Sequence, residues 1–237
     1  MSKLLDSRVL VVGGSSGIGL AVATQASELG ARVTIVSRSL EKLDAAASTI
    51  GNGVEIAALD TSDNGEVQKF FSARDSFDHV VVSAAQTPSG SLRILPLEDA
   101  KRAMESKFWG AYRIAKEARI KERGTLTFVS GFLSERPSAT SVLQGAINAA
   151  LEALARGLAL EFSPVRVNTV SPGLINTPLW GKMDLAAKEA MFERVANNLP
   201  ARTIGEPSDI ANAVVFLMTT PFATGSTVRV DGGGVIA

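Results

Sequence analysis

Residues 8–21 read RVLVVGGSSGIGLA, and this stretch decides how the rest of the chain is interpreted. The apolar run at residues 9–12 predicts a buried strand, and residues 18–29 carry apolar side chains at helical spacing. The glycines between them let the backbone turn sharply and approach a pair of phosphates at the helix N-terminus. Their spacing is G-x-x-x-G-x-G, and a further strand at residues 32–37 closes a βαβ unit around them. The alternative is a tight strand–helix turn that binds no ligand.

The composition indicates a globular α/β protein. The chain has 237 residues, of which 46% are hydrophobic, with 24 basic against 24 acidic side chains and no cysteine. This length and apolar content predict one large domain over residues 1–237. Balanced charge points away from nucleic acid and anionic membranes, and missing cysteine excludes disulfides and thiolate chemistry. Residues 1–13 are too short in apolar length for a signal peptide and no later stretch spans a bilayer, so we expect a cytoplasmic protein.

Strands and helices are expected to alternate along the whole chain. The predicted strands cover residues 9–12, 32–37, 54–59, 80–82, 125–129, 165–170 and 228–230. The predicted helices cover residues 18–29, 40–50, 63–73, 97–123, 141–162, 184–198 and 208–219. This pattern predicts a single doubly wound Rossmann-type domain, with a seven-stranded, mostly parallel sheet and helices on both faces. Ligands of such sheets bind beyond the carboxyl ends of the strands, where we expect the functional residues.

The end of the second predicted strand indicates which dinucleotide would bind. In dinucleotide folds an acidic residue about twenty residues past the glycines holds the ribose 2′-hydroxyl and selects NAD. Here that position is the neutral Ser37, and Arg38 beside it is able to pair with a 2′-phosphate. We therefore expect NADP(H), the alternative being an exposed arginine without a ligand.

Further motifs give the chain a resemblance to the classical short-chain dehydrogenase/reductase family over essentially its whole length. The glycine turn matches the family's cofactor turn, Asp60 occupies the position of its adenine-contacting aspartate, and residues 166–173 (RVNTVSPG) are similar to its R-V-N-x-V-x-P-G segment. Residues 172–177 then fit the P-G-x-x-x-T motif that holds the nicotinamide end. The resemblance implies a cofactor site built from Gly13, Ser15, Ser16, Gly17, Ile18, Gly19, Ser37, Arg38, Asp60, Thr61, Ala84, Pro172, Gly173, Ile175 and Thr177.

The catalytic positions of that family are all altered in this chain. Counted back from residues 158–161, the Y-x-x-x-K motif of the family falls on Gln144 and Asn148. Its serine falls on Gly131, next to Ser130, and its asparagine falls on Lys107. A cation and an amide have therefore been exchanged between the two helices that flank the site.

Lys107 has two interpretations. If its side chain points inward, apolar surroundings lower its pKa, and it is able to donate or accept a proton near neutral pH. Proton transfer then comes from Lys107 directly, or through a water molecule held together with Gln144, Asn148 and Ser130. The alternative is a side chain that extends to solvent or pairs in the neighbourhood of Glu105.

Other chemistries have little support in the sequence. His79 is the only histidine and begins a predicted strand, far from the carboxyl end where ligands bind, which argues against a Ser-His-Asp hydrolase. No cluster of histidines or carboxylates indicates a metal. Glu135 and Arg136 follow the fifth predicted strand, where they either reach a substrate or form a solvated surface pair.

These observations favour an NADP(H)-dependent oxidoreductase that acts on a small carbonyl or alcohol through a non-standard proton-transfer site. Two alternatives are a catalytically silent NADP(H)-binding protein, acting as a sensor or scaffold, and a non-redox isomerase or lyase that uses the same pocket. The helix at residues 141–162 is apolar on more than one face, which predicts burial against a second subunit in a homodimer or homotetramer.

Overall fold

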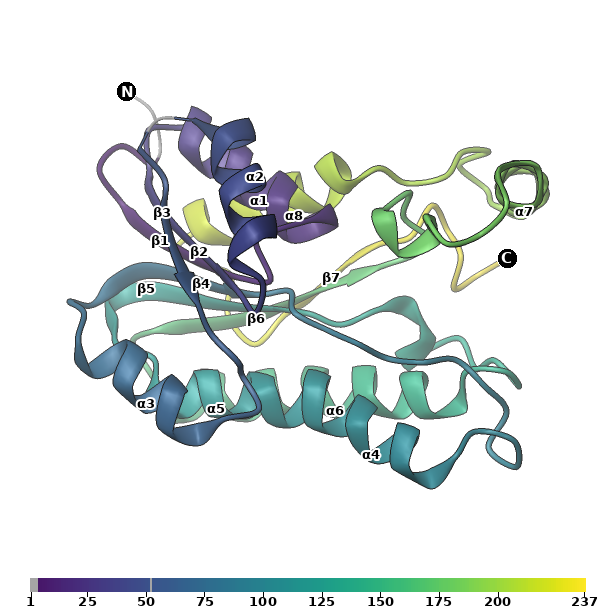
Figure 1. The fold of residues 1–237 in the computed structure, drawn as a ribbon, viewed down its shortest axis with the longest axis horizontal. Helices are drawn as coiled ribbons and strands as arrows, with labels where there is room; N and C mark the ends of the chain where they lie inside the picture. The colour runs from purple at the N-terminus through teal and green to yellow at the C-terminus, as the bar shows by residue number, and fades with distance from the viewer. Residues whose placement is uncertain (1–3, 52) are drawn as a thin grey trace.

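The computed structural model describes residues 4–51 and 53–237, which form a seven-stranded sheet in the order β3-β2-β1-β4-β5-β6-β7 (Figure 1). Every pair of neighbouring strands is parallel, so the predicted doubly wound α/β fold is confirmed. The strands are β1 (Arg8–Val12), β2 (Arg32–Ser37), β3 (Glu55–Ala58), β4 (Phe77–Val82), β5 (Ile120–Val129), β6 (Arg166–Pro172) and β7 (Thr227–Val230).

Helices cover both faces of the sheet because successive side chains of each strand point to opposite sides. In β1, Val9 and Val11 pack on the face covered by α1 (Gly17–Glu28), α2 (Leu40–Ile50) and α8 (Pro207–Thr219). Leu10 and Val12 pack on the other face, against α3 (Asn64–Ser72), α5 (Gly110–Glu117) and α6 (Val142–Glu161). The central strands are therefore buried on both faces, whereas the edge strands β3 and β7 are only partly buried. Ligands of such a sheet bind beyond the carboxyl ends of its strands.

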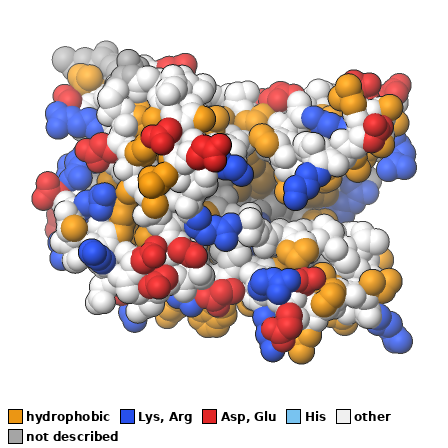
Figure 2. All heavy atoms as spheres, in the orientation of Figure 1, with side chains coloured by type: hydrophobic (Ala, Val, Ile, Leu, Met, Phe, Trp, Pro, Cys, Tyr) orange, Lys and Arg blue, Asp and Glu red, His pale blue; other side chains and the backbone are white. Residues whose placement is uncertain are grey.

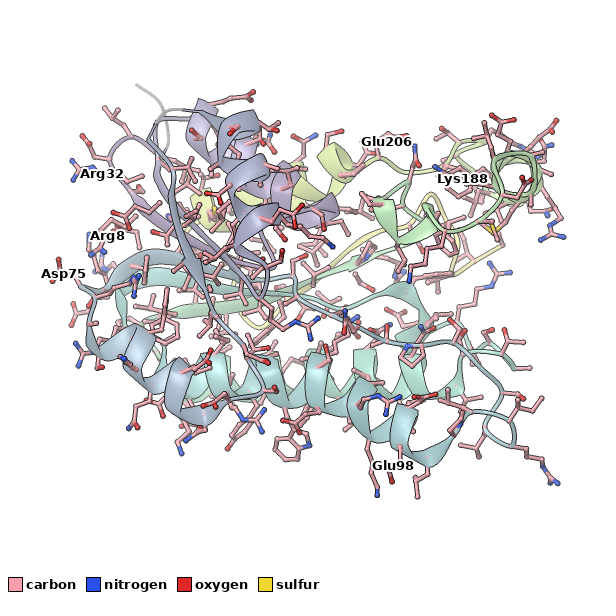
Figure 3. All side chains as sticks on the ribbon, viewed as in Figure 1. Arg8, Arg32, Asp75, Glu98, Lys188 and Glu206 are labelled. Carbon is pink, nitrogen blue, oxygen red and sulfur yellow. The ribbon has the colours of Figure 1, made fainter. Side chains whose placement is uncertain are left out.

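The remaining helices lie at the margins. The short helix α4 (Leu97–Met104) precedes η1 (Glu105–Trp109) and α5, while α7 (Leu185–Asn198) extends away from the sheet and buries none of its residues (Figure 1). Short turns of helix are η2 (Phe132–Ser134) and η3 (Pro178–Trp180). In the space-filling view a recess separates the α7 side of the molecule from the α4 side (Figure 2). Lys188 on α7 and Glu98 on α4 mark these two sides in Figure 3.

The predicted helix over residues 97–123 is confirmed as far as residue 117 and is wrong beyond it. The structure divides it into α4, the π-helical turn η1 and α5, and starts β5 at Ile120 instead of residue 125. Residues 116–123 (KEARIKER) are mostly good helix formers, which is why local propensity favours continuing the helix. Pairing with β4 overrides this propensity: Ile120 lies beside Phe77 in the sheet, and the Phe77 N–H donates to the Arg119 carbonyl at 2.8 Å.

Among residues 4–51 and 53–237, no helix has the length and hydropathy to cross a membrane. The same residues hold no group of three or more His, Cys, Asp or Glu side chains placed to bind a metal ion.

Candidate functional site

The glycine turn after β1 is closed by backbone contacts that leave no room for side chains. Gly13 has a φ of 86°, and a Cβ there would lie 2.6 Å from the Ala84 backbone nitrogen at the end of β4. A Cβ at Gly19 would overlap the Gly13 carbonyl oxygen. Both positions therefore need glycine if the turn is to keep this shape.

The N-terminus of α1 faces out of this turn with its N–H groups available. Its first turn carries no acidic residue, and the cap residue Ser16 makes no side-chain capping bond. Ser16 is exposed, while Ser15 and Ile18 beside it are partly buried. A side chain at Gly17 would touch Thr177 at 3.4 Å, which places the loop after β6 directly against the turn. This arrangement is the kind that holds a phosphate.

Arg38 is exposed at the end of β2 and, within the described part of the chain, makes no hydrogen bond or ion pair. Ser37 beside it donates to the Ser39 carbonyl at 3.3 Å. The Asp60 carboxylate accepts from the Ser62 N–H at 2.9 Å and from its hydroxyl at 2.7 Å. The Ser62 N–H bond chiefly lowers the Asp60 pKa, with a weaker contribution from Arg38. The Arg38 guanidinium therefore contributes to the lowered Asp60 pKa without forming an ion pair with it, and it is able to bind another anion.

The predicted positions after β3 and β6 also lie at this end of the sheet. Thr61 offers its carbonyl to Arg113 at 3.4 Å and packs on α5. Pro172 ends β6, and the Gly173 N–H donates to the Val230 carbonyl at 3.0 Å. Ile175 is buried in the core, and its carbonyl accepts from the Trp180 indole at 3.0 Å. Its side chain is therefore structural, whereas Thr177 faces the glycine turn.

Lys107 points inward, which decides between its two interpretations. Its Nζ donates to the Ser130 carbonyl oxygen at 2.7 Å and to the Asn148 Oδ1 at 2.6 Å. Burial of the amine lowers the Lys107 pKa from 10.5 to about 8, against an opposing effect of the Glu152 charge. The exchanged cation and amide are thus in direct contact, between η1, α6 and the carboxyl end of β5.

Gly131 makes room for this contact. A Cβ at this position would lie 2.7 Å from the Asn148 Nδ2, closer than a side chain is able to approach. Asn148 is 4% exposed, so its amide has little space to move aside. The glycine at the position of the family's serine and the asparagine at the position of its lysine are therefore sterically linked.

The four residues predicted for proton transfer are only partly brought together. Gln144 Nε2 donates to the Thr87 carbonyl at 2.7 Å and to the Ser89 hydroxyl at 3.2 Å, so it binds the loop after β4 instead of Lys107. Ser130 is in place, but it offers Lys107 its carbonyl, while its hydroxyl donates to Glu152 at 2.8 Å.

Glu152 is a functional candidate that the sequence reasoning missed. It is 7% exposed on α6, and Ser134 donates to the same oxygen as Ser130, at 2.7 Å. The signal in the sequence was its position four residues after Asn148, which puts both on one face of a helix.

Glu135 and Arg136 do not pair with each other. Glu135 forms an ion pair with Arg229 on β7, and Arg136 donates to the Gly234 carbonyl at 2.6 Å. Both side chains therefore tie the loop after β5 to the C-terminal segment. His79 is buried within the sheet, where its Nδ1 lies 2.8 Å from the Thr125 hydroxyl. It takes no part in the candidate site.

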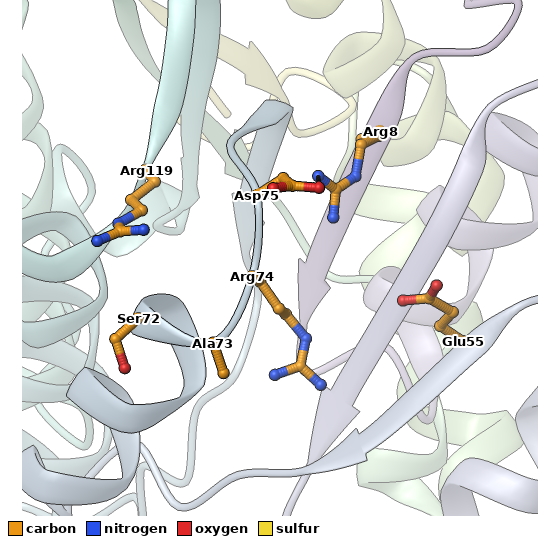
Figure 4. A pocket seen from close by; sticks show the side chains of 7 residues that line it. All are labelled: Arg8, Glu55, Ser72, Ala73, Arg74, Asp75 and Arg119. Carbon is orange, nitrogen blue, oxygen red and sulfur yellow. Dashed lines mark ion pairs between the residues drawn. The ribbon is translucent and has the colours of Figure 1, made fainter.

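A cavity of about 390 Å³ lies at the opposite end of the molecule, beside the amino ends of β1 and β3 (Figure 4). Arg8 pairs there with Asp75 at 3.5 Å, and Arg74 donates to the Phe70 carbonyl at 3.2 Å. These arginines hold the connection between α3 and β4. The length of the sheet separates this cavity from Lys107, so we do not assign the site to it.

Comparison with known proteins identifies the family. A family model described as enoyl-(acyl carrier protein) reductase matches residues 12–234. The short-chain dehydrogenase/reductase ATR9 of Stachybotrys chlorohalonatus is 31% identical over the whole of both chains. The chain belongs to the short-chain dehydrogenase/reductase family. Within that family, the 3-oxoacyl-[acyl-carrier-protein] reductase of Rattus norvegicus is 30% identical over 97% of this chain and 98% of its own.

Solved structures agree with this assignment. A crystal structure of a small-chain dehydrogenase in complex with NADPH has a TM-score of 0.86 and 34% sequence identity, covering 98% of this chain and all of the other. The relatives are described as dehydrogenases and reductases, so the chain belongs to a family of oxidoreductases.

Proposed function

We propose that this chain is an NADP(H)-dependent oxidoreductase of a small carbonyl or alcohol substrate, in which Lys107 transfers the proton. The observation that carries the proposal is the inward Lys107 amine, held by Ser130 and Asn148 at the carboxyl ends of the strands. The similarity to a dehydrogenase crystallised with NADPH supports the choice of cofactor.

The residues present fit such a cofactor. The turn at Gly13 and Gly19 admits no side chain, so its backbone is able to approach a diphosphate at the N-terminus of α1. The exposed guanidinium of Arg38, which has no hydrogen-bond or ion-pair partner among the described residues, would hold a 2′-phosphate. Gly173 and Thr177 would line the nicotinamide end. When bound, the nicotinamide supplies or accepts a hydride.

Lys107 has the donors and the acidity for the proton transfer. A protonated lysine has three N–H donors, and two of them are used on Ser130 and Asn148. The third is left for a substrate oxygen. With a pKa of about 8, the amine is mostly protonated at neutral pH and yields a proton more readily than an ordinary lysine. Asn148 and the Ser130 carbonyl hold it in place.

The test is oxidation of NADPH, followed by its absorbance, with a panel of small ketones. Lys107→Ala should lower the rate by about 10²–10⁴, the usual effect of losing a general acid. Lys116→Ala, on the exposed face of α5, is the matched control and should leave the rate unchanged. Brisk turnover by both variants would show that another group supplies the proton.

A catalytically silent NADP(H)-binding protein is the second candidate, and the position of Gln144 favours it. Gln144 carries no transferable proton at neutral pH and binds Thr87 and Ser89. The discriminating variant combines Gln144→Tyr, Asn148→Lys and Lys107→Asn, which installs the family's residues at these positions. Turnover by this variant alone, with NADPH binding equal in both proteins, would establish the silent binder.

We further propose that residues 1–237 act as one domain in a cytoplasmic homodimer or homotetramer. Trp109 and Tyr112 are each 43% exposed and stack edge to face at 5.6 Å beside α6. On α6, Leu160 is 84% exposed. Exposed aromatic side chains of this size are typical of a surface that a partner covers.

A further inference from the structure

The Lys107 site continues inward to a second ionisable side chain. Glu152 lies one turn after Asn148 on α6 and is 7% exposed. Its Oε1 accepts from the hydroxyls of Ser130 and Ser134 at 2.8 and 2.7 Å. Ser130 also gives its carbonyl oxygen to the Lys107 amine at 2.7 Å. Ser130 therefore contacts both ionisable side chains, Lys107 through its carbonyl oxygen and Glu152 through its hydroxyl.

The Lys107 ammonium needs a negative charge nearby, because an unpaired buried charge is strongly destabilising. The other carboxylates around the site are engaged elsewhere. Glu105, two residues before Lys107, pairs with Arg113 at 2.6 Å, and Glu135 pairs with Arg229. The Asp231 carboxylate accepts from the N–H groups of residues 233 and 235.

The basic groups around the site are accounted for as well. Arg136 donates to the Gly234 carbonyl. Arg229 pairs with Glu135, and the charges of Asp231 and Glu152 also act on it. Glu152 is the carboxylate linked to Lys107 through a single residue, because Ser130 contacts both side chains, and its charge opposes the lowering of the Lys107 pKa by burial.

We infer that Glu152 is a positioning residue: its buried carboxylate fixes Ser130 and supplies the counter-charge that keeps the Lys107 amine protonated at neutral pH. Asn148, the residue exchanged with the lysine, is neutral and does not supply this negative charge. The role in turnover rests on the proposed function, whereas the effect on Lys107 does not.

The experiment follows the titration of Lys107 by NMR of protein with 13C-labelled lysine, the signal being assigned by its absence in Lys107→Ala. Glu152→Gln keeps an oxygen for both serines and removes the charge. We expect the Lys107 midpoint to fall by about one pH unit, the lower end of the effect of a close opposite charge. At a fixed pH above both midpoints, this is a tenfold fall in the ratio of ammonium to amine.

Ser134→Ala is the matched control, because it removes one hydrogen bond to the carboxylate and keeps the charge. Its Lys107 midpoint should stay at the wild-type value. If Glu152→Gln does not fold, Glu152→Met combined with Ser134→Ala removes carboxylate and hydroxyl together, and Ser130 still has the Val170 carbonyl at 3.4 Å. An unshifted midpoint in the folded variant, or an equal shift in Ser134→Ala, would overturn the inference.

The pH profile of activity separates the two proposals. The high-pH fall in kcat should move to lower pH in Glu152→Gln together with the NMR midpoint. A midpoint that moves while the activity profile stays fixed supports the role of Glu152 and contradicts Lys107 as the proton donor. A fixed midpoint contradicts the role of Glu152 whatever the activity does.

Discussion

Burial of the Lys107 amine has a measurable effect on the pH dependence of stability, and Lys107→Met reveals it. The Lys107 pKa is about 8 in the fold against 10.5 as the reference for an unfolded chain. The folded state therefore binds this proton less tightly than the unfolded state. Linkage gives a destabilisation of about 3 kcal/mol at pH 7 that decreases to about 2 kcal/mol at pH 9. It is fully present below the folded pKa and is lost as the pH rises toward the unfolded pKa.

Methionine keeps an unbranched side chain but has no amine to titrate. The two hydrogen bonds lost with the amine change stability by an amount that does not depend on the Lys107 titration. Urea unfolding of both proteins at pH 7 and pH 9, at one protein concentration, should therefore show wild type gaining about 1 kcal/mol relative to Lys107→Met. Lys116→Met, at an exposed position of α5, should show no such gain. A constant difference between wild type and Lys107→Met would refute the burial of the amine.

Three further outcomes are expected. Arg38→Ala should remove most of a tenfold to hundredfold preference for NADPH over NADH, because a charge-assisted contact contributes about 1.5–3 kcal/mol; equal affinities in the wild type would contradict the assignment. Burial lowers the His79 pKa from 6.5 to about 4, so unfolding scans should show stability lost as the pH falls from about 6.5 to 4, and much less so in His79→Gln. Light scattering should find an oligomer at micromolar concentration and a smaller species for Trp109→Ser with Tyr112→Ser; a monomeric wild type would argue against the interface.

The fold could be predicted because it depends on patterns that are local. Alternating apolar strands and amphipathic helices fix a parallel sheet, and the glycine turn fixes its ligand-binding end. The end of the helix at Glu117 could not be predicted, because residues 118–123 favour a helix and only pairing with β4 makes them extended. Tertiary contacts decide such positions.

The direction of Lys107 depends on a feature that sequence periodicity does not contain. Lys107 lies within η1, a π-helical turn. Its hydrogen bonds join residues five apart instead of four, so the side chains that follow point in other directions than a 3.6-residue repeat predicts. Whether Lys107 points inward or to solvent was therefore open from the sequence. The sequence predicts that Ser130 belongs to the site, but not which of its atoms act there. Its carbonyl oxygen accepts from Lys107, and its hydroxyl donates to Glu152. Atom-level roles of this kind follow from the backbone geometry at the end of β5.

The exchange of lysine and asparagine involves a third position, and the three must be considered as one unit. A side chain at position 131 would meet the Asn148 amide at 2.7 Å, so the family's serine and this asparagine exclude each other in the present geometry. Moving Asn148 would also remove the 2.6 Å bond that holds the Lys107 amine. Reversing the exchange at positions 107 and 148 alone would therefore place a lysine side chain at position 148 beside Gly131. That glycine is sterically required by the present asparagine and not by the family's lysine. Gly131 is thus needed for the present contact between Asn148 and Lys107, and a complete reversal of the exchange includes Gly131→Ser.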